Sequence, residues 1–278
     1  MKRSFKVRTF FIVLFMCFLF PIVSPALPKG DCTVPKPKLD YSHCDFSSAL
    51  DRKGMNAKNK LFVGANFQGA NLQGADFEGF NLEGAVFVGA NLQDAIFVEA
   101  KLEKADFTGA NLTGVDFEEA DLAYTVFIMA KLPGVKLQRM SLYQINFEGA
   151  DLHGANFEYS NIQNNNFKGA KLGGAKFKKA KIQATYFGGA DLKKANFLGS
   201  AFKPLLHNGP PKRNEWGFKH GERTVFTKPY VIYNEFTGAD LTGANLKMAR
   251  FKGIIFDGAT WVDGKNCKPE GIKNKCIR

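Results

Sequence analysis

The sequence predicts an all-β chain whose five-residue units wind into a coil around one apolar core. Three observations predict it. Phe, Leu or Ile occupies every fifth position from Phe67 to Phe202, which makes 28 consecutive units. Phe and Leu alternate at these central positions over most of that range. The position two residues before the centre is Ala in 18 of the 28 units.

The five-residue period excludes the two ordinary secondary structures. On an α-helix, five residues turn the chain by about 500°, so the central residues would wander around the helix axis. In a flat strand, successive central residues would point to opposite faces because five is odd. All central residues point inward only if each unit forms one side of a coil and the chain turns a corner after it.

The alternation of Phe and Leu adds a ten-residue period, which requires an even number of sides in each coil. Phenylalanine rings and smaller aliphatic side chains then stack in separate columns and fill the axis without voids.

The repeated unit resembles that of the pentapeptide-repeat proteins. Units 65–69, 70–74 and 75–79 read ANFQG, ANLQG and ADFEG, and the resemblance covers roughly residues 39–264. It implies a right-handed quadrilateral β-helix with four units in each coil. It also implies that the small residue two positions before the centre points inward at a crowded corner, where a larger side chain would clash. The 28 units then form seven coils, which span about 34 Å at the spacing of paired strands.

The first 26 residues have the pattern of an export signal. Four basic residues precede an apolar stretch at 10–23, and Ser24-Pro25-Ala26 fits a cleavage site. The apolar stretch is short for a membrane span, although a retained anchor stays open as an alternative. Removal of the signal lowers the net charge from +12 to +8. The pattern predicts an exported protein, in the periplasm or an equivalent lumen, without a membrane span after cleavage.

Four cysteines remain after the signal, and they form two close pairs at the ends of the repeats. Cys32 and Cys44 lie in an N-terminal segment and cap at 27–64, and Cys267 and Cys276 lie in a C-terminal cap at 265–278. An even number of cysteines in an exported chain predicts disulfides, whose connectivity stays open. A buried free thiol is the alternative for Cys44. The spacing argues against zinc, because it contains no C-x2-C.

The repeat is interrupted once by a long insertion. Residues 65–202 form the first block and residues 234–264 the second, and the intervening loop at 203–233 places 29 extra residues between successive centres. The loop is basic and aromatic, and its segments 224–226 and 230–233 are expected to pair as strands. A long excursion from a repetitive body either carries function or is a tolerated insertion packed on one face.

A second departure lies between Thr125 and Ile145. The inner corner positions there hold Thr125, Val135, Met140 and Ile145 in place of small residues, and Leu137 replaces the Phe that the alternation predicts. Larger corners beside a smaller centre can compensate one another in volume. The alternative is a local bulge or kink that shapes a binding surface.

Charge changes sign along the chain. Residues 65–124 contain 11 acids and 2 bases, whereas residues 125–203 contain 12 bases and 4 acids. Such charges are either a solvated face or a surface for an anionic partner, such as a protein or an envelope component. The opposed ends also allow head-to-tail association. The candidate contact residues are Lys168, Lys171, Lys176, Lys178, Lys179, Lys181, Lys193 and Lys194 in the coils and Lys212, Arg213, Trp216, Phe218, Lys219 and Arg223 in the insertion.

The sequence predicts a non-catalytic interaction scaffold without a metal or other cofactor. The four histidines have no metal-ligand spacing, and no nucleophile or phosphate-binding motif occurs. Some members of the family resemble DNA and bind gyrase through a continuous acidic surface, which is the first alternative function. The basic net charge and the export signal argue against it and against nucleic acid as a partner. An enzyme with a site in the insertion is the second alternative.

Overall fold

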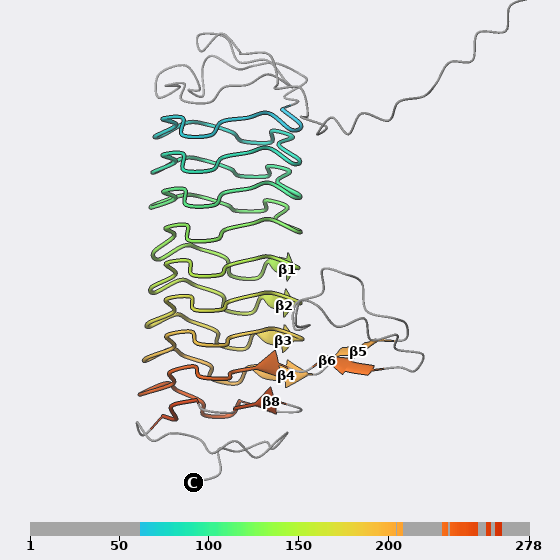
Figure 1. Ribbon diagram of the computed structural model, residues 1–278, viewed down its shortest axis with the longest axis vertical. Coiled ribbons are helices and arrows are strands. Elements are labelled where there is room, and N and C mark those ends of the chain that lie inside the picture. The colour runs from blue at the N-terminus through green and yellow to red at the C-terminus, as the bar shows by residue number, and fades with distance from the viewer. Residues whose placement is uncertain are drawn as a thin grey trace, which may run out of the picture.

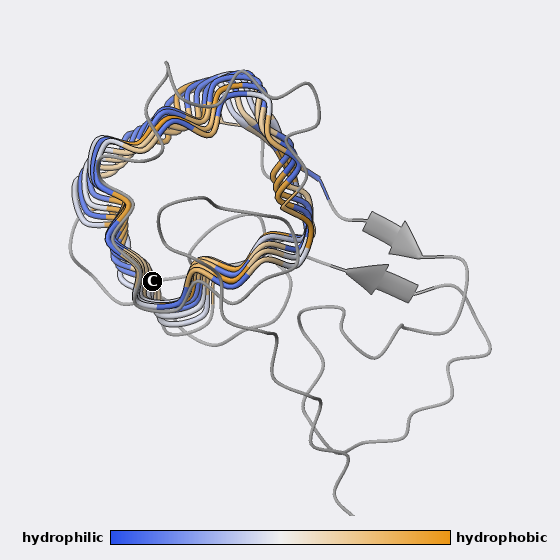
Figure 2. Ribbon diagram, turned by 90° about the horizontal axis from the view of Figure 1, so that it is seen from above, coloured by the Kyte–Doolittle hydropathy of each residue, from blue (hydrophilic) through white to orange (hydrophobic). Residues whose placement is uncertain are grey.

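The computed structural model describes residues 62–203, 205–207, 230–232, 234–249, 254–256 and 259–262. All of these except 205–207 and 230–232 form one stack of coils (Figure 1). Seen from above, the coils superimpose on one closed ring, and residues of similar hydropathy lie above one another (Figure 2). The predicted all-β coil with an internal core is therefore confirmed. The residues described include no α-helix with the length and hydrophobicity of a membrane span.

Each coil contains four five-residue units, as the resemblance implied. Parallel bridges join each unit to the fourth unit after it, such as Asn66 to Val86 and Asn71 to Asn91. We number the sides of a coil by their central residues: first (Phe67), second (Leu72), third (Phe77) and fourth (Leu82), each continued by the equivalent unit of every later coil. Bonds such as that from the Phe67 N–H to the Val86 C=O, at 2.7 Å, join one coil to the next.

Regular strands are short because each side turns a corner at the end of its unit. On the fourth side, β1 (Ser141–Tyr143), β2 (Asn161–Gln163), β3 (Lys181–Gln183) and β4 (Ala201–Lys203) form a parallel four-stranded sheet in chain order. Strands β7 (Asn234–Glu235) and β8 (Ile254–Ile255) pair in parallel after the insertion. Most other units pair through single bridges.

The core consists of separate columns of rings and aliphatic side chains, as predicted. On the first side Phe67 stacks on Phe87 at 4.9 Å between ring centroids, with 5° between the planes. Phe67 also meets Phe77 of the third side edge-on at 6.0 Å and 71°. Aromatic pairs of this kind add roughly 0.5–1.5 kcal/mol each to the gain from burial. The coils are therefore held by contacts along and across the axis.

The fifth position of each unit adopts a left-handed backbone, which explains why glycine is common there. Gly74 has φ of 67°, and the non-glycine residue Lys104 in the same position of a later unit has φ of 62°. The corner therefore fixes the backbone angle, and side chains other than hydrogen are accepted there at a conformational cost.

The coil resumes in register after the insertion. Asp191 bridges Asp240 and Asn196 bridges Asn245. The two partners are therefore separated in sequence by one coil plus the inserted residues. Strand β5 (Leu205–His207) pairs antiparallel with β6 (Tyr230–Ile232) and leaves the coil sideways (Figure 1). The structure shows that β5, at the base of the loop next to β4, is a partner of β6 that the sequence did not predict, and the pairing of 230–233 with 224–226 stays a prediction. Residues 224–226 lie outside the described part.

The coil begins earlier than residue 65. Phe62 is buried at a central position of the fourth side, and its N–H donates to the Asn81 C=O at 2.7 Å. Its ring packs on Phe80, which fills an inner corner, at 5.3 Å. Residues 62–64 of the segment assigned to the N-terminal cap therefore already belong to the β-helix.

Candidate functional site: a cleft between two coils

Among the described coils, the longest interruption of the ladder of bonds between coils lies between residues 114–122 and 133–141. The regular pattern requires the N–H groups of Phe117, Glu119 and Leu122 to donate to the C=O groups of residues 136, 138 and 141. In the described coils these bonds are absent, and so are those from the N–H groups of Lys136 and Ser141 to residues 115 and 120. The bridges from Asn111 to Lys131 and from Val126 to Asn146 remain. The Tyr124 N–H still donates to the Tyr143 C=O at 3.0 Å, so the two coils separate along the third side and the first part of the fourth side.

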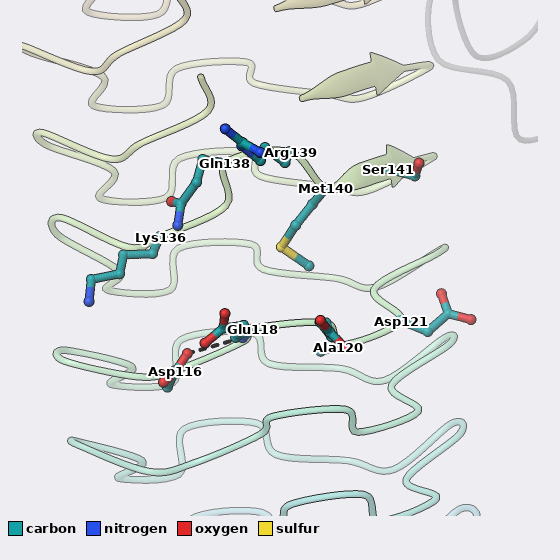
Figure 3. Close-up of a pocket in the computed structure, with 10 residues that line it drawn as sticks. Asp116, Glu118, Ala120, Asp121, Lys136, Gln138, Arg139, Met140 and Ser141 are labelled. Atoms are coloured by element: carbon teal, nitrogen blue, oxygen red, sulfur yellow. Dashed lines mark hydrogen bonds between the residues drawn. The ribbon is translucent and has the colours of Figure 1, made fainter. Parts of the chain in front are cut away.

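Large residues at inner corners explain the separation. Met140 lies at a fourth-side corner, where the neighbouring coils carry Ala120 and Ser160. Its side chain is only partly buried and extends toward the coil of Ala120 (Figure 3). Val115 and Val135 occupy the preceding inner corner of the same two coils, and both are buried. Close-packed interiors do not accept such added volume without moving the backbone.

The central column is also weakened here. Leu137 replaces phenylalanine, so the stack of rings on the third side ends at Phe117 and resumes at Phe157. Phe97 and Phe117 stack at 5.4 Å with 24° between their planes, compared with 4.8 Å and 3° for Phe87 and Phe107. Of the two interpretations of this region, compensated volume is insufficient, because the ladder opens locally.

The separated coils enclose a cleft of about 820 Å³. We call it the inter-coil cleft. It is lined by Asp116, Glu118, Glu119, Ala120 and Asp121 from one coil and Lys136, Gln138, Arg139, Met140 and Ser141 from the next. Figure 3 shows Asp116, Glu118 and Asp121 on one coil and Lys136 and Arg139 on the next, with the Arg139 side chain directed away from the acidic coil. The cleft therefore lies where the charge of the chain changes sign.

Opposite charges line the cleft without pairing across it. Within the described residues, no ion pair joins an acid of one lip to Lys136 or Arg139 of the other. The Asp116 carboxylate accepts a bond from the Glu118 N–H at 3.0 Å, which keeps it on its own coil. The Arg139 guanidinium lies 5.7 Å from the centre of the Tyr159 ring. The lips consequently present charges to solvent or to a ligand.

The predicted lysines do not form one patch, because the coil distributes them over all four sides. Lys168 pairs with Glu148 at 2.9 Å, and Lys193 pairs with Asp240 at 3.3 Å. The pKa of Lys168 is raised by its hydrogen bond to Glu148. Lys171 and Lys194 lie on the second side and Lys181 on the fourth. These lysines therefore face different directions.

The remaining three predicted lysines share the third side with the cleft. Lys176, Lys178 and Lys179 belong to one unit, and the Lys179 ammonium lies 5.5 Å from the centre of the Tyr159 ring. Tyr159 thus contacts Arg139 from the coil before it and Lys179 from the coil after it, and its side chain is exposed. Cations over aromatic faces are held by the ring quadrupole. This basic strip continues from the cleft along the third side.

The other predicted site residues lie outside the described residues. These are Lys212, Arg213, Trp216, Phe218, Lys219 and Arg223 of the insertion and the cysteines Cys32, Cys44, Cys267 and Cys276. Sequence reasoning did not name the cleft residues Asp116, Glu118, Glu119 and Asp121 as a site. The sequence does contain a signal for this site: Met140 is a large corner residue, and the acidic residues lie one coil before it.

The pKa values of two aspartates in the described coils are lowered by hydrogen bonds at the surface. Burial tends to raise the pKa of Asp151, but hydrogen bonds from the side chain and N–H of His153 outweigh it and lower the pKa. The Asp240 pKa is lowered in the same way by Thr242 and Lys193 against the effect of burial. Among the residues that the structure describes, no group of three His, Cys, Asp or Glu side chains is placed to hold a metal ion.

Two family profiles match the chain. The profile described as "Pentapeptide repeats (8 copies)" matches residues 65–103, 100–139 and 235–260. The profile described as "Pentapeptide repeat region" matches residues 125–197. Together they cover more than half of the chain. Comparison with curated proteins finds no significant match.

Solved structures of repeat proteins are also similar. HetL, a pentapeptide repeat protein involved in heterocyst differentiation regulation in the cyanobacterium Nostoc sp. strain PCC 7120, is 23% identical over 75% of this chain and 94% of its own, with a TM-score of 0.31. A thylakoid-lumen pentapeptide repeat protein from Arabidopsis thaliana is 32% identical over 36% of this chain and 71% of its own, with a TM-score of 0.33. The plasmid-mediated fluoroquinolone resistance protein QnrB1 is 15% identical over 73% of this chain and 92% of its own, with a TM-score of 0.33.

Proposed function

Because the chain belongs to the pentapeptide-repeat family, whose members are generally non-catalytic, we propose that it is a rigid interaction scaffold in an exported compartment. Its partner is a protein or an anionic component of the envelope. The observation that carries the proposal is the reversal of charge along the rod, from 11 acids and 2 bases in 65–124 to 12 bases and 4 acids in 125–203.

The scaffold role follows from the way the coils are held. The stacked rings of the first side continue along the axis past the inter-coil cleft, and the central residues from Phe67 to Phe202 are buried. A solenoid of this kind keeps its surface groups at fixed separations, because each repeat is braced by its neighbours. Charged groups on such a rod therefore form a fixed pattern for a partner.

The basic strip on the third side is the proposed contact surface. We define it as Lys136, Arg139, Tyr159, Lys176, Lys178 and Lys179. Within the described coils its cations form no ion pairs with carboxylates, whereas Lys168 and Lys193 do. An exposed tyrosine between two cations adds apolar contact area at a small entropic cost. The export signal that the sequence predicts at 1–26 supports an extracytoplasmic partner.

A gyrase-binding DNA mimic remains the competing function, and the acidic first coils favour it. The acidic surface of this chain, however, ends at the inter-coil cleft, and the third side is basic in the coils that follow. Cell fractionation separates the two functions, since a gyrase ligand must be cytosolic. Recovery of the mature chain from the envelope or lumen is expected, and a purely cytosolic chain would contradict the scaffold proposal.

Affinity capture with matched charge variants tests the contact surface. The triple change Lys176→Glu, Lys178→Glu and Lys179→Glu reverses the strip, and Lys171→Glu, Lys181→Glu and Lys203→Glu makes the same change in net charge on other sides. Capture of an envelope partner by the full chain is expected to survive the second set and to be lost with the first. Equal loss with both sets would show attraction by net charge alone and would contradict a defined surface.

A further inference from the structure

The inter-coil cleft exposes two backbone edges that are not hydrogen-bonded to each other. One edge offers the N–H groups of Phe117, Glu119 and Leu122, and the facing edge offers the C=O groups of residues 136, 138 and 141. In the described coils no side chain takes their place. Unpaired edges of β-structure are templates for another strand, because each unmade backbone bond is costly when it is shielded from water.

The walls of the cleft favour a peptide that carries basic side chains. Asp116, Glu118, Glu119 and Asp121 form one lip, and two cations lie on the other. Two of the carboxylates accept bonds from backbone N–H groups of their own unit, at 3.0 Å for Asp116 and 3.1 Å for Asp121. Glu118 and Glu119 have exposed side chains. The excess of carboxylates therefore selects positive charge.

The shape of the cleft suits an extended segment. Its volume of about 820 Å³ is within the range of about 300–1,000 Å³ for pre-formed ligand sites. Ala120 and Met140 supply apolar contact between the charged lips. A strand places alternate side chains on opposite faces. Small side chains would then meet these two residues while basic side chains point outward beside the carboxylates.

We propose that the inter-coil cleft binds an extended, lysine- or arginine-bearing peptide segment of a partner, which pairs as a strand with the two separated coils. The proposal rests on the scaffold function above and names its recognition site and the chemistry of the partner. Recognition has two components. Backbone hydrogen bonds supply affinity, and the carboxylates of the acidic lip supply selectivity for charge.

Peptide probes test the two components separately. The full chain without its signal is titrated with an end-blocked hexapeptide of alternating lysine and valine, with its glutamate–valine counterpart, and with the lysine–valine peptide methylated at alternate backbone nitrogens. Binding is followed by calorimetry at low and at physiological salt. The lysine–valine peptide is expected to bind at least tenfold more tightly than either control. Equal binding of the methylated peptide would overturn strand pairing, and equal binding of the acidic peptide would overturn the charge preference.

Variants of the protein locate the binding. Met140→Ala is expected to let the coils close and to abolish peptide binding while the chain stays folded. Met129→Ala is the matched control, because Met129 is 66% exposed and lies on the first side. Glu118→Gln with Glu119→Gln keeps the cleft open and is expected to weaken binding of the lysine–valine peptide at least tenfold. Undiminished binding by either cleft variant would overturn the proposal.

The outcomes separate this inference from the scaffold function. If no peptide binds but envelope capture still depends on the basic strip, the cleft proposal fails and the scaffold function stands. If peptide binding follows the predicted pattern but capture does not depend on the strip, the cleft is the contact site and the strip is not. If a small zwitterion such as free lysine binds as tightly as the peptide, strand pairing is overturned.

Discussion

Two corners of the coil break the same rule and behave differently. On the first side, Thr125, Ile145 and Asn165 replace alanine, yet the bridges from Val126 to Asn146 and from Asn146 to Asn166 are intact. On the fourth side, Met140 replaces alanine and the ladder opens. Size alone therefore does not decide whether neighbouring coils stay paired.

The difference lies in hydrogen bonding. The Thr125 hydroxyl donates to the Leu122 C=O at 2.7 Å. The buried Asn165 amide donates to the Leu142 C=O at 3.0 Å and accepts from the Ile145 N–H at 2.7 Å. Asn165 thereby replaces the backbone bond from the Ile145 N–H to the Leu142 C=O that an alanine corner would make, whereas Thr125 keeps its own, from its N–H to the Leu122 C=O at 3.2 Å. Methionine adds comparable volume but has no side-chain hydrogen-bond donor, so the Met140 side chain holds the two coils apart.

The largest expected effect follows removal of the polar corner. Asn165→Leu keeps the volume but leaves the Ile145 N–H and the Leu142 C=O buried without partners. Each such group costs about 1–3 kcal/mol, so the free energy of unfolding is expected to fall by roughly 3 kcal/mol or more. Chemical denaturation measures it.

Asn156→Ala is the control for that change. Asn156 is only half-buried and its Oδ1 accepts one local bond, from the Glu158 N–H at 3.0 Å. A loss of about 1 kcal/mol or less is expected. A loss as large as that of Asn165→Leu would show that the corner amide has no special role.

A methionine placed in the regular region should reproduce the defect. The second side carries alanine at every described inner corner from Ala70 to Ala259, and Ala110 is fully buried. Ala110→Met is expected to destabilise the chain by about 1–3 kcal/mol through overpacking. It should also weaken the bond from the Lys131 N–H to the Ala110 C=O. A variant with unchanged stability would show that corners accept methionine freely.

Removal of the natural methionine should act in the opposite direction. Met140→Ala permits the missing bonds to form, each worth about 0.5–1.5 kcal/mol net, and loses part of the apolar contact of methionine. A net gain of about 1 kcal/mol is expected, measured as a higher midpoint of denaturation. Met129→Ala should change stability by less than about 0.5 kcal/mol. Destabilisation by Met140→Ala would contradict the wedge.

The smallest effect concerns the ion pair across the insertion. The pKa of Asp240 is lowered in the folded chain, because hydrogen bonds from Thr242 and Lys193 outweigh burial. Its stabilising contribution is therefore complete above about pH 4, the value for an unfolded aspartate, and is lost as the pH falls through the folded pKa. Asp240→Asn should cost under about 1 kcal/mol at neutral pH, and the difference from wild type should vanish in acid. A pH-independent difference would exclude this titration.

The coil could be predicted from sequence because its rule is local. A buried residue at every fifth position, from Phe67 onward, admits only a structure that turns after each unit. The alternation of Phe and Leu indicated the separate columns. The break in the repeat after Phe202 indicated the insertion. Each of these is encoded within one or two successive units.

The cleft could not be predicted because it depends on neighbours a full coil away. Thr125, Ile145 and Met140 all look alike as breaks in the alanine pattern. Whether one of them opens the ladder depends on a partner such as Asn165, which lies one coil after Ile145. The pairing of β5 with β6 was missed for a similar reason, because β5 lies at the start of the insertion and β6 near its end.

Hydrogen exchange of individual amides in the wild-type chain tests the central claim most directly. Phe97, Glu99 and Leu102 donate to the next coil at 2.8 to 2.9 Å, whereas Phe117, Glu119 and Leu122, one coil later on the same sides, face the cleft. The second set is expected to exchange faster by on the order of a hundredfold. Equal protection of the two sets would contradict an open cleft held apart by Met140.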